Sequence, residues 1–399
     1  MENYYYSFEF PEMQPQMNPI TVGVAGSGNL EISVQANPNL NVSEIWVSTG
    51  VGGYKSSWDA VIARFMQEHP YGGLSFTLKD AGATPPVVAL RLGQALETYQ
   101  TGYRKNSNYI ESNSRTRILS LVDEGSFQEF LSNVDCSSPN LPDLNLQTAS
   151  DDGVVIGRAT FQGIPCAIAS QEKDFIGGAV GEVHGAKLIG LIRYAIKHTL
   201  SACIFLIDSG GVRLQEANVG EIEISEIIRA LLDAKSAGIK SIGVVCSQNG
   251  AYGGMGIISG IMDSLIVNQT GRIGVSGAEV IQAVKGAEVF DSSDRPLIWR
   301  VYGGRTRYLQ RAAQSYSTHD IKSIRTAILE AMQPQQELIN TTLLTEEQRI
   351  LQQRIEQAHE CSEEGEWLEK YKPQLYAQDV FGVTDQEFQH IVQGEEHGI

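Results

Sequence analysis

The sequence predicts an α/β protein of two unlike domains, and three observations support this. Between residues 118 and 340, short apolar runs, glycine-rich turns and amphipathic segments follow one another in the order strand, turn, helix. Four repeats of that order are typical of a mostly parallel sheet with buried strands. Residues 1–104 instead combine alternating strand patterns with two helices, as in a small α+β module. The length of 399 residues is enough for two or three domains with sizeable cores.

The first domain, residues 1–104, contains four predicted strands and two predicted helices. The strands are TVGVAG, LEISVQA, SEIWVSTGV and LSFTL, and the residues GSGN form a turn between the first two. One helix is indicated by apolar residues at helical spacing, namely Trp58, Val61, Ile62, Phe65 and Met66. The second helix begins near Pro85 and buries Val88, Leu92, Ala95, Leu96 and Tyr99.

A polar segment separates this domain from the rest of the chain. The stretch TGYRKNSNYIESNSRTR has few apolar residues and several Asn and Ser, so we interpret residues 105–117 as a linker, with an exposed first helix as the alternative. The second domain, residues 118–399, then begins. Its strands CAIAS, CIFLI, IGVVC and SLIVN each precede a glycine-containing turn and a helix, and Gly238 stops the second of these helices. From about residue 345 the chain is acidic and predicted to be helical.

Composition excludes several classes of protein. With 30 Lys+Arg against 47 Asp+Glu, the net charge of −17 argues against binding to nucleic acid or to an anionic membrane. The five cysteines are far apart and form no C-x-x-C pair, so they offer no metal site. Their odd number and wide spacing favour a reducing compartment, in which thiols stay free. No signal peptide is recognisable, and the longest apolar run is too short to span a bilayer. We therefore expect a cytoplasmic protein.

Three glycine pairs lie where strands end: Gly177-Gly178, Gly210-Gly211 and Gly253-Gly254. Such turns let backbone amides approach a phosphate or a developing oxyanion. Any one of them can equally serve tight turning and close packing. Three in consecutive cycles favour a ligand site, because ligands bind at the carboxyl edge of parallel strands. No P-loop sequence is present.

Few ionisable residues lie near these turns. Arg213 follows the second pair and either binds a substrate carboxylate or pairs with Glu216 three residues on. His184 lies near a helix start, where a packing or capping role competes with that of a proton donor. Ser27, in AGSGNLE, is either a hairpin-turn residue or the attachment point of a covalent carrier group.

Several motifs resemble those of one enzyme complex. VAGSGNLEISV, KDAGATPPVVALRLGQALE and the early SFEF are similar to the acyl-carrier (delta) subunit of biotin-independent malonate decarboxylase. FIGGAVGEVHGAK, DSGGVRLQEAN, GAYGGMGIISG and DSSDRPLIWR are similar to its beta subunit. The chain thus resembles a fusion of two normally separate subunits. One motif departs from the family: GAEVIQA stands where the family has a GPEVIEQ-like segment.

The resemblance implies a carrier and a decarboxylase on one chain. Ser27 would bear a phosphoribosyl-dephospho-CoA group, added by a prosthetic-group transferase, whose thiol carries acetyl or malonyl. An alpha subunit would exchange acetyl for malonyl on this carrier. The beta domain, of crotonase-like carboxyltransferase fold with repeated ββα units, would decarboxylate the malonyl thioester together with a gamma subunit. Neither biotin nor a metal is expected in this chain, and no A-M-K-M sequence occurs.

The family pattern also assigns roles to the turns. Backbone amides of Gly211-Val212 and Gly253-Gly254 would stabilise the enolate oxygen that forms as carbon dioxide leaves. Gly177, Gly178 and Arg213 would bind the substrate. The proton donor to the product stays open among His184, Tyr252, water and a residue of the partner subunit. Two other functions stay open: a carboxyltransferase subunit of a biotin-dependent enzyme, and a non-catalytic assembly subunit.

Overall fold

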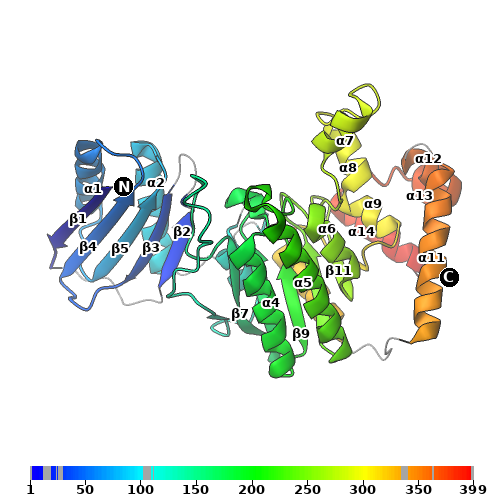
Figure 1. Cartoon of the computed structure of the whole chain (residues 1–399), viewed down its shortest axis with the longest axis horizontal. Coiled ribbons are helices and arrows are strands. Elements are labelled where there is room, and N and C mark those ends of the chain that lie inside the picture. The colour runs from blue at the N-terminus through cyan, green and yellow to red at the C-terminus, as the bar shows by residue number, and fades with distance from the viewer. Residues whose placement is uncertain are drawn as a thin grey trace.

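The computed structural model describes residues 2–11, 19–23, 25, 30–101, 109–110, 112–333, 340–361 and 364–396. They form two domains, each built on one sheet, and Figure 1 shows the first domain at one end of the molecule with its β2 edge nearest the second. The predicted fold class is confirmed: a small α+β domain precedes a larger domain whose sheet is mostly parallel.

The first domain has the sheet order β1-β4-β5-β3-β2, with β4 and β5 parallel and the other neighbours antiparallel. Its elements are β1 (Glu2–Glu9), β2 (Ile20–Gly23), β3 (Leu30–Ala36), β4 (Val42–Thr49), α1 (Lys55–Glu68), β5 (Leu74–Asp80) and α2 (Pro85–Thr101). Both predicted helices are present, and α2 begins at Pro85 as predicted. Their predicted apolar faces are buried against the sheet, with Ile62 and Leu92 at 0% exposure.

Strand β1 is an element that the sequence analysis did not predict. It pairs antiparallel with β4 along its whole length. Its side chains alternate between the two faces, so that Tyr4, Tyr6 and Phe8 pack against the core. On the other face, Tyr5 contacts Trp46 with ring centroids 4.3 Å apart, and both rings are half exposed. The two-residue period was present in YYYSFEF, but three consecutive tyrosines hid it.

The second domain has the sheet order β12-β11-β10-β9-β8-β7-β6, parallel from β8 to β12. Its strands are β6 (Gln128–Glu129), β7 (Val154–Phe161), β8 (Ile164–Gln171), β9 (Ala202–Leu206), β10 (Lys240–Val245), β11 (Ser264–Val267) and β12 (Ser315–Tyr316). Its helices are α3 (Ser114–Leu121), η1 (Ile176–Gly178), α4 (Glu182–Lys197), η2 (Leu214–Glu216), α5 (Asn218–Ser236), α6 (Gly253–Ile261), α7 (Ala278–Lys285), α8 (Arg295–Tyr302), α9 (Gly304–Leu309) and α10 (Ile321–Met332). All four predicted strand–turn–helix cycles are present.

Helices cover both faces of this sheet. One apolar core holds α4, α5 and α6 against the strands, and a second core holds α3 and α10 against the opposite face. The central strands between them are largely buried, and every residue of β9 and β11 is buried. Parallel strands covered on both faces lack polar alternation, which is why the four apolar runs are recognisable in the sequence.

The acidic end of the chain is helical, as predicted: α11 (Thr341–His359), α12 (Glu364–Tyr371), α13 (Pro373–Ala377) and α14 (Asp385–Glu396). Leu368, Leu375 and Phe388 extend the core of the second domain, so α12 to α14 belong to it. Helix α11 has no buried residue. At one edge of Figure 1 it lies apart from the sheet.

The expected linker is only partly a linker. Its last residues form the start of α3, where the Asn113 side chain caps the helix by accepting from the Thr116 amide at 2.8 Å. Arg117 and Ile118 are buried, at 1% and 0% exposure, so the alternative of an exposed helix is also wrong here. The sequence misleads because α3 buries the polar residues Ser114 and Arg117, and Arg117 pairs there with the enclosed Asp208. Residues 102–108 and 111 lie outside the described part.

Two further features concern the chain as a whole. Cys166, Cys203 and Cys246 lie in the core, as predicted from their apolar surroundings, and Cys136 and Cys361 are partly exposed free thiols. Among the described residues, no helix combines the length and the apolar character needed to cross a membrane.

Candidate functional site

The glycine pairs meet at one edge of the second sheet. Strands β8 to β11 run parallel, so the turns that follow them lie side by side. Isolated bridges join these turns directly, pairing Val180 with Val212 and Ser209 with Ala251. The Tyr252 amide also donates to the Ser209 carbonyl oxygen at 3.0 Å. The arrangement predicted for the three turns is therefore present.

Two of the turns touch where glycine is required. A Cβ atom on Gly253 would lie 3.2 Å from the Cα atom of Gly211, and one on Gly211 would lie 3.3 Å from the Tyr252 carbonyl oxygen. Both glycines have positive φ, at 53° and 122°. A larger residue at either position would push the turns apart, so the close approach depends on both glycines.

The amides in these turns differ in what they bind. Gly210 donates to the Gly177 carbonyl at 2.9 Å, Gly211 donates to the Ser209 hydroxyl at 3.2 Å, and Gly253 donates to the Val275 carbonyl at 3.0 Å. Within the described part of the chain, the amides of Val212 and Gly254 have no such partner. Both residues are partly exposed. The geometry therefore favours Val212 and Gly254 as the donors open to a ligand.

The first glycine pair divides into two roles. A Cβ atom on Gly178 would lie 1.9 Å from the Asp208 carbonyl oxygen, so this glycine permits close packing of one turn on the next. A Cβ atom on Gly177 would meet no other atom within 4 Å, and Gly177 itself is exposed. The Gly177 carbonyl accepts from Gly210 and from the Asn249 side chain at 3.3 Å.

A buried ion pair between Asp208 and Arg117 fixes the start of the turn that follows β9. Asp208, directly after β9, pairs with Arg117 of α3 at 2.7 Å, and both side chains are enclosed. Asp208 also accepts from the Asn249 amide at 2.7 Å, and its own amide donates to the Gln171 side chain at 3.2 Å. These contacts hold the ends of β8, β9 and β10 together. The sequence analysis missed Arg117, which reads as a surface residue of a polar segment.

Arg213 does not face the turns. Its side chain is fully buried and pairs with Asp152 at 2.8 Å and with Glu216 at 3.7 Å. Its other donors bind the carbonyl oxygens of Ala179 at 3.1 Å and Asp152 at 2.7 Å. The guanidinium is thus occupied by the protein itself. Of the two predicted roles, the geometry contradicts substrate binding and favours the ion pair with Glu216. Asp152 is a second and nearer partner of the same guanidinium.

His184 is also an interior residue. It lies in the first turn of α4 with 0% exposure, and its Nε2 atom is 3.1 Å from the Gln171 side-chain nitrogen. Its backbone amide donates to Asp152 at 2.9 Å. Burial, together with the charges of Arg213 and Lys187, holds the pKa of the imidazole well below its usual value. A neutral, enclosed ring in contact with Gln171 suits positioning better than proton transfer to a ligand.

Tyr252 lies directly before the Gly253-Gly254 pair and is partly exposed. Its ring packs edge-on against Tyr302, with centroids 5.5 Å apart. Burial raises the pKa of the Tyr252 phenol to about 12, so the hydroxyl keeps its proton at neutral pH. Among the predicted side chains, this one is placed beside the open amides.

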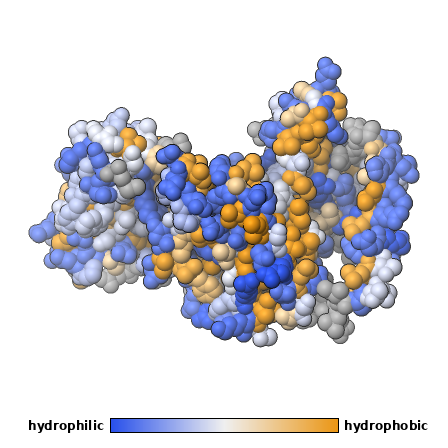
Figure 2. Space-filling model, viewed as in Figure 1, coloured by the Kyte–Doolittle hydropathy of each residue, from blue (hydrophilic) through white to orange (hydrophobic). Residues whose placement is uncertain are grey.

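Exposed apolar side chains surround this edge of the sheet. Leu214 is 77% exposed, Ile257 on α6 46%, and Val284 on α7 81%. Figure 2 shows hydrophobic residues gathered on α7 and α8, which project from the domain beside the turns. Large exposed apolar surface of this kind marks interaction sites. The segment GAEVIQA, which departs from the family pattern, forms α7.

Ser27 lies outside the described residues. Strand β2 ends at Gly23 and β3 begins at Leu30, and Gly23 pairs with Glu31 in the antiparallel register. The intervening segment thus connects the edge strand β2 to its neighbour β3.

Comparisons with known proteins match both domains. The malonate decarboxylase delta subunit (MdcD) family matches residues 17–99, and the carboxyl transferase domain matches residues 111–296. A malonyl-S-ACP:biotin-protein carboxyltransferase, MADC of Malonomonas rubra, is 32% identical over 252 residues, 59% of this chain and 79% of its own. The malonate decarboxylase acyl carrier protein of Stenotrophomonas maltophilia is 41% identical over 103 residues, 26% of this chain and 97% of its own.

A solved structure is similar as well. A chain of the Pseudomonas malonate decarboxylase hetero-tetramer in complex with malonate shares 35% identity with a TM-score of 0.55, over 57% of this chain and 83% of that one. With the carboxyl transferase match, this confirms the crotonase-like carboxyltransferase fold expected for the second domain.

Proposed function

This chain belongs to the carboxyl transferase family, and it also carries an acyl-carrier domain of the malonate decarboxylase delta-subunit family. We therefore propose that it both carries a malonyl thioester and decarboxylates it. Carbon dioxide and an acetyl thioester are the products. The chain would therefore act as a carboxy-lyase component of a multisubunit complex.

The observation that carries this proposal is the pair of open amides of Val212 and Gly254. When a malonyl thioester loses carbon dioxide, negative charge develops on the thioester oxygen. Two amides aimed at one point stabilise that charge, and a single such donor is worth about 3 kcal/mol. The glycines beside them, Gly211 and Gly253, bring the two turns close enough to share one ligand atom.

We assign the carrier role to Ser27. The family's phosphoribosyl-dephospho-CoA group, when bound there, supplies a thiol on a long arm that holds the acyl group as a thioester. A hydroxyl is the donor this linkage needs. The match of residues 17–99 to the malonate decarboxylase delta subunit supports this assignment.

The remaining predicted residues receive separate roles. Gly177 is exposed beside the second turn, so we assign it to the substrate, and we assign Gly178 to packing of the turn. Tyr252 is the side chain that we propose as the proton donor to the product carbon, since its phenol stays protonated beside the amides. His184 positions Gln171 and, through it, the Asp208 amide.

Partners complete the proposed cycle. The exposed apolar residues around the turns fit a gamma subunit that closes the site and excludes water. An alpha subunit would exchange acetyl for malonyl, and a transferase would add the group to Ser27. The similar Pseudomonas enzyme is a hetero-tetramer, which supports a multisubunit assembly.

A second candidate function is carboxyl transfer to biotin. The relative MADC, by its name, acts on malonyl-S-ACP and a biotin protein. The same open amides would serve this reaction, because it also passes through negative charge on the thioester oxygen. The two functions differ in the fate of the carboxyl group: it leaves as free carbon dioxide in the first, whereas in the second it is transferred to the biotin ureido nitrogen, whose proton is delivered to the enolate carbon.

The test is release of carbon dioxide from malonyl-CoA by the assembled complex, with and without avidin. Gly211→Ala should separate the two turns, so that one of the two amides no longer reaches the thioester oxygen. Because the loss of one such donor lowers turnover about a hundredfold, we expect a decrease of that size. Gly238→Ala is the control, because it has a positive φ of 77° but lies at the end of α5 with open space around it. Loss of all activity with avidin would favour the biotin reaction, and equal effects of both variants would contradict the role of the turns.

A further inference from the structure

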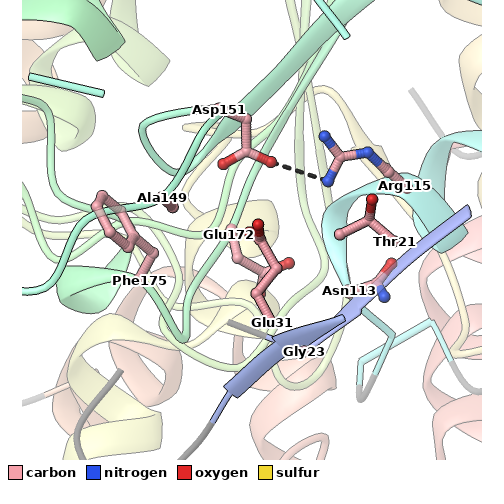
Figure 3. A pocket seen from close by; sticks show the side chains of 9 residues that line it. All are labelled: Thr21, Gly23, Glu31, Asn113, Arg115, Ala149, Asp151, Glu172 and Phe175. Carbon is pink, nitrogen blue, oxygen red and sulfur yellow. Dashed lines mark ion pairs between the residues drawn. The ribbon is translucent and has the colours of Figure 1, made fainter. Parts of the chain in front are cut away.

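A cavity lies between the two domains. The first domain contributes Thr21, Gly23 and Glu31, and the second contributes Asn113, Arg115, Ala149, Asp151, Glu172 and Phe175. In Figure 3, Glu31 points from its strand into the space faced by Asp151 and Arg115. Most of these residues are charged or polar, and the proposed function assigns no role to those charged and polar side chains.

Glu31 is the buried carboxyl of the first domain at this contact. Its side chain is 6% exposed, and its Oε1 atom accepts from the Ser150 hydroxyl at 3.4 Å, which joins the two domains. Within its own domain it pairs in register with Lys79 of β5, whose Nζ atom is 3.9 Å away and whose side chain is 37% exposed. The nearest cation of its own domain is thus distant and partly solvated.

On the other side, the cations are already engaged by other acids. Arg115 lies 2.8 Å from Asp151 and binds Glu129 through two hydrogen bonds of 2.7 and 3.0 Å. Lys187 donates to the Asp151 carbonyl oxygen at 2.6 Å. Glu172, also at the cavity, accepts from the Ser114 amide at 2.9 Å. Among the described residues that line the cavity, the acids Glu31, Asp151 and Glu172 outnumber the one base, Arg115, and the negative charge of Glu31 would face that of Asp151.

We propose that this contact is a docking site for the carrier-like domain on the catalytic domain, and that it holds the carrier only while Glu31 is protonated. Ionised Glu31, enclosed beside Asp151, would have too little compensating charge to remain docked. Release would then free the carrier to travel. That last consequence rests on the proposed function, whereas the docking itself does not.

The electrostatics of Glu31 agree with the geometry. Burial, and after it the Asp151 carboxylate, raise the pKa of Glu31 to about 7, although Lys79, Arg115 and Ser150 act in the opposite direction. Burial likewise raises the pKa of Glu172. Burial also opposes ionisation of Asp151, but Arg115 and Lys187 outweigh it, so the pKa of Asp151 is lowered and its charge persists.

The pH dependence follows from linkage. Undocking would expose Glu31 to water and return its pKa toward the ordinary value of 4.5, whereas in the docked state its pKa is about 7. The docked state therefore binds the proton more tightly. Docking is strongest below about pH 4.5 and weakens by roughly two orders of magnitude up to about pH 7, above which it is constant.

Small-angle X-ray scattering of the full chain tests this proposal. We expect the radius of gyration to rise between about pH 4.5 and about pH 7 as the carrier domain leaves, and Glu31→Gln to stay compact throughout because its side chain cannot ionise. Glu9→Gln, at the exposed end of β1, is the matched control and should behave as the wild type. A wild-type chain without a transition, or a transition that persists in Glu31→Gln, would overturn the proposal.

A second variant keeps the test decisive if Glu31→Gln does not fold. Lys79→Met removes the cation nearest Glu31 in its own domain from a partly exposed position. The transition should then move to higher pH, because the charged form of Glu31 loses its compensation. An unchanged or lower midpoint in this variant contradicts the docking site, even if Glu31→Gln fails to fold. Decarboxylation of free malonyl-CoA should be unaffected in both variants, so the outcome is independent of the proposed function.

Discussion

At the scale of single residues, the roles of charged side chains depend on partners far along the chain. Arg213 lies next to a glycine turn, and the sequence alone leaves substrate binding and pairing with Glu216 equally open. Its strongest partner, Asp152, is 61 residues away. No local pattern identifies such a pair, and the same is true of Arg117 with Asp208 and of Glu31 with the loop around Asp151.

Replacing Arg213 should therefore affect stability rather than substrate affinity. Arg213→Met leaves Asp152 buried without its cation, and breaking a buried pair in this way costs about 3–5 kcal/mol. Urea unfolding of the second domain should show this loss, and the KM for malonyl-CoA should not change among molecules that stay folded. Arg193→Ala, on the exposed face of α4, should change stability by less than about 0.5 kcal/mol. A raised KM at unchanged stability would restore Arg213 to the substrate site.

The glycine turns were predictable at this scale. Their position after apolar strands identified the carboxyl edge of the sheet, and the structure brings all three together. The sequence could not distinguish open amides from engaged ones. Gly211 and Gly253 have partners, whereas Val212 and Gly254 have none among the described residues, and this depends on the path of the neighbouring turns.

At the scale of elements, the buried parallel strands and their helices were predictable because burial on both faces leaves a continuous apolar run. Two elements were missed or misjudged. Strand β1 is an edge strand with alternate tyrosines on both faces, and α3 buries polar residues that find their partners only after folding. In both cases the contacts that stabilise the element are long-range. Local composition therefore gave no indication of β1 and a wrong indication of a linker at the start of α3.

The turn formed by η1 offers a matched pair of variants. Gly177 and Gly178 have nearly the same φ, at 64° and 68°, but only a Cβ atom on Gly178 would collide with a backbone oxygen. Gly177→Ala should cost about 1 kcal/mol from backbone strain alone. Gly178→Ala should cost several times as much, because the turn must move away from Asp208. Thermal unfolding of both proteins measures the difference, and equal midpoints would mean that the two turns can separate freely.

At the scale of the whole molecule, an acyl-carrier domain and a carboxyl transferase domain reside on one polypeptide. If the proposed function holds, this covalent connection keeps the carrier at roughly millimolar effective concentration at the catalytic site. Shortening the chain within residues 102–108 should lower turnover of carrier-bound malonyl and leave release of carbon dioxide from free malonyl-CoA intact. Both rates are measured on the same preparation. Equal losses in the two assays would show that the connection serves stability rather than delivery.

The most direct measurement of the central claim is the intact mass of this chain during a single turnover. The chain is first modified by the prosthetic-group transferase and loaded with malonyl, and it is then mixed with the partner subunits. We predict that its mass falls by one carbon dioxide, leaving an acetylated chain, and that Gly211→Ala remains malonylated much longer. Ser27→Ala should take up no group at all. Absence of modification on the folded wild-type chain, or loss of the whole malonyl group without an acetylated product, would contradict the account.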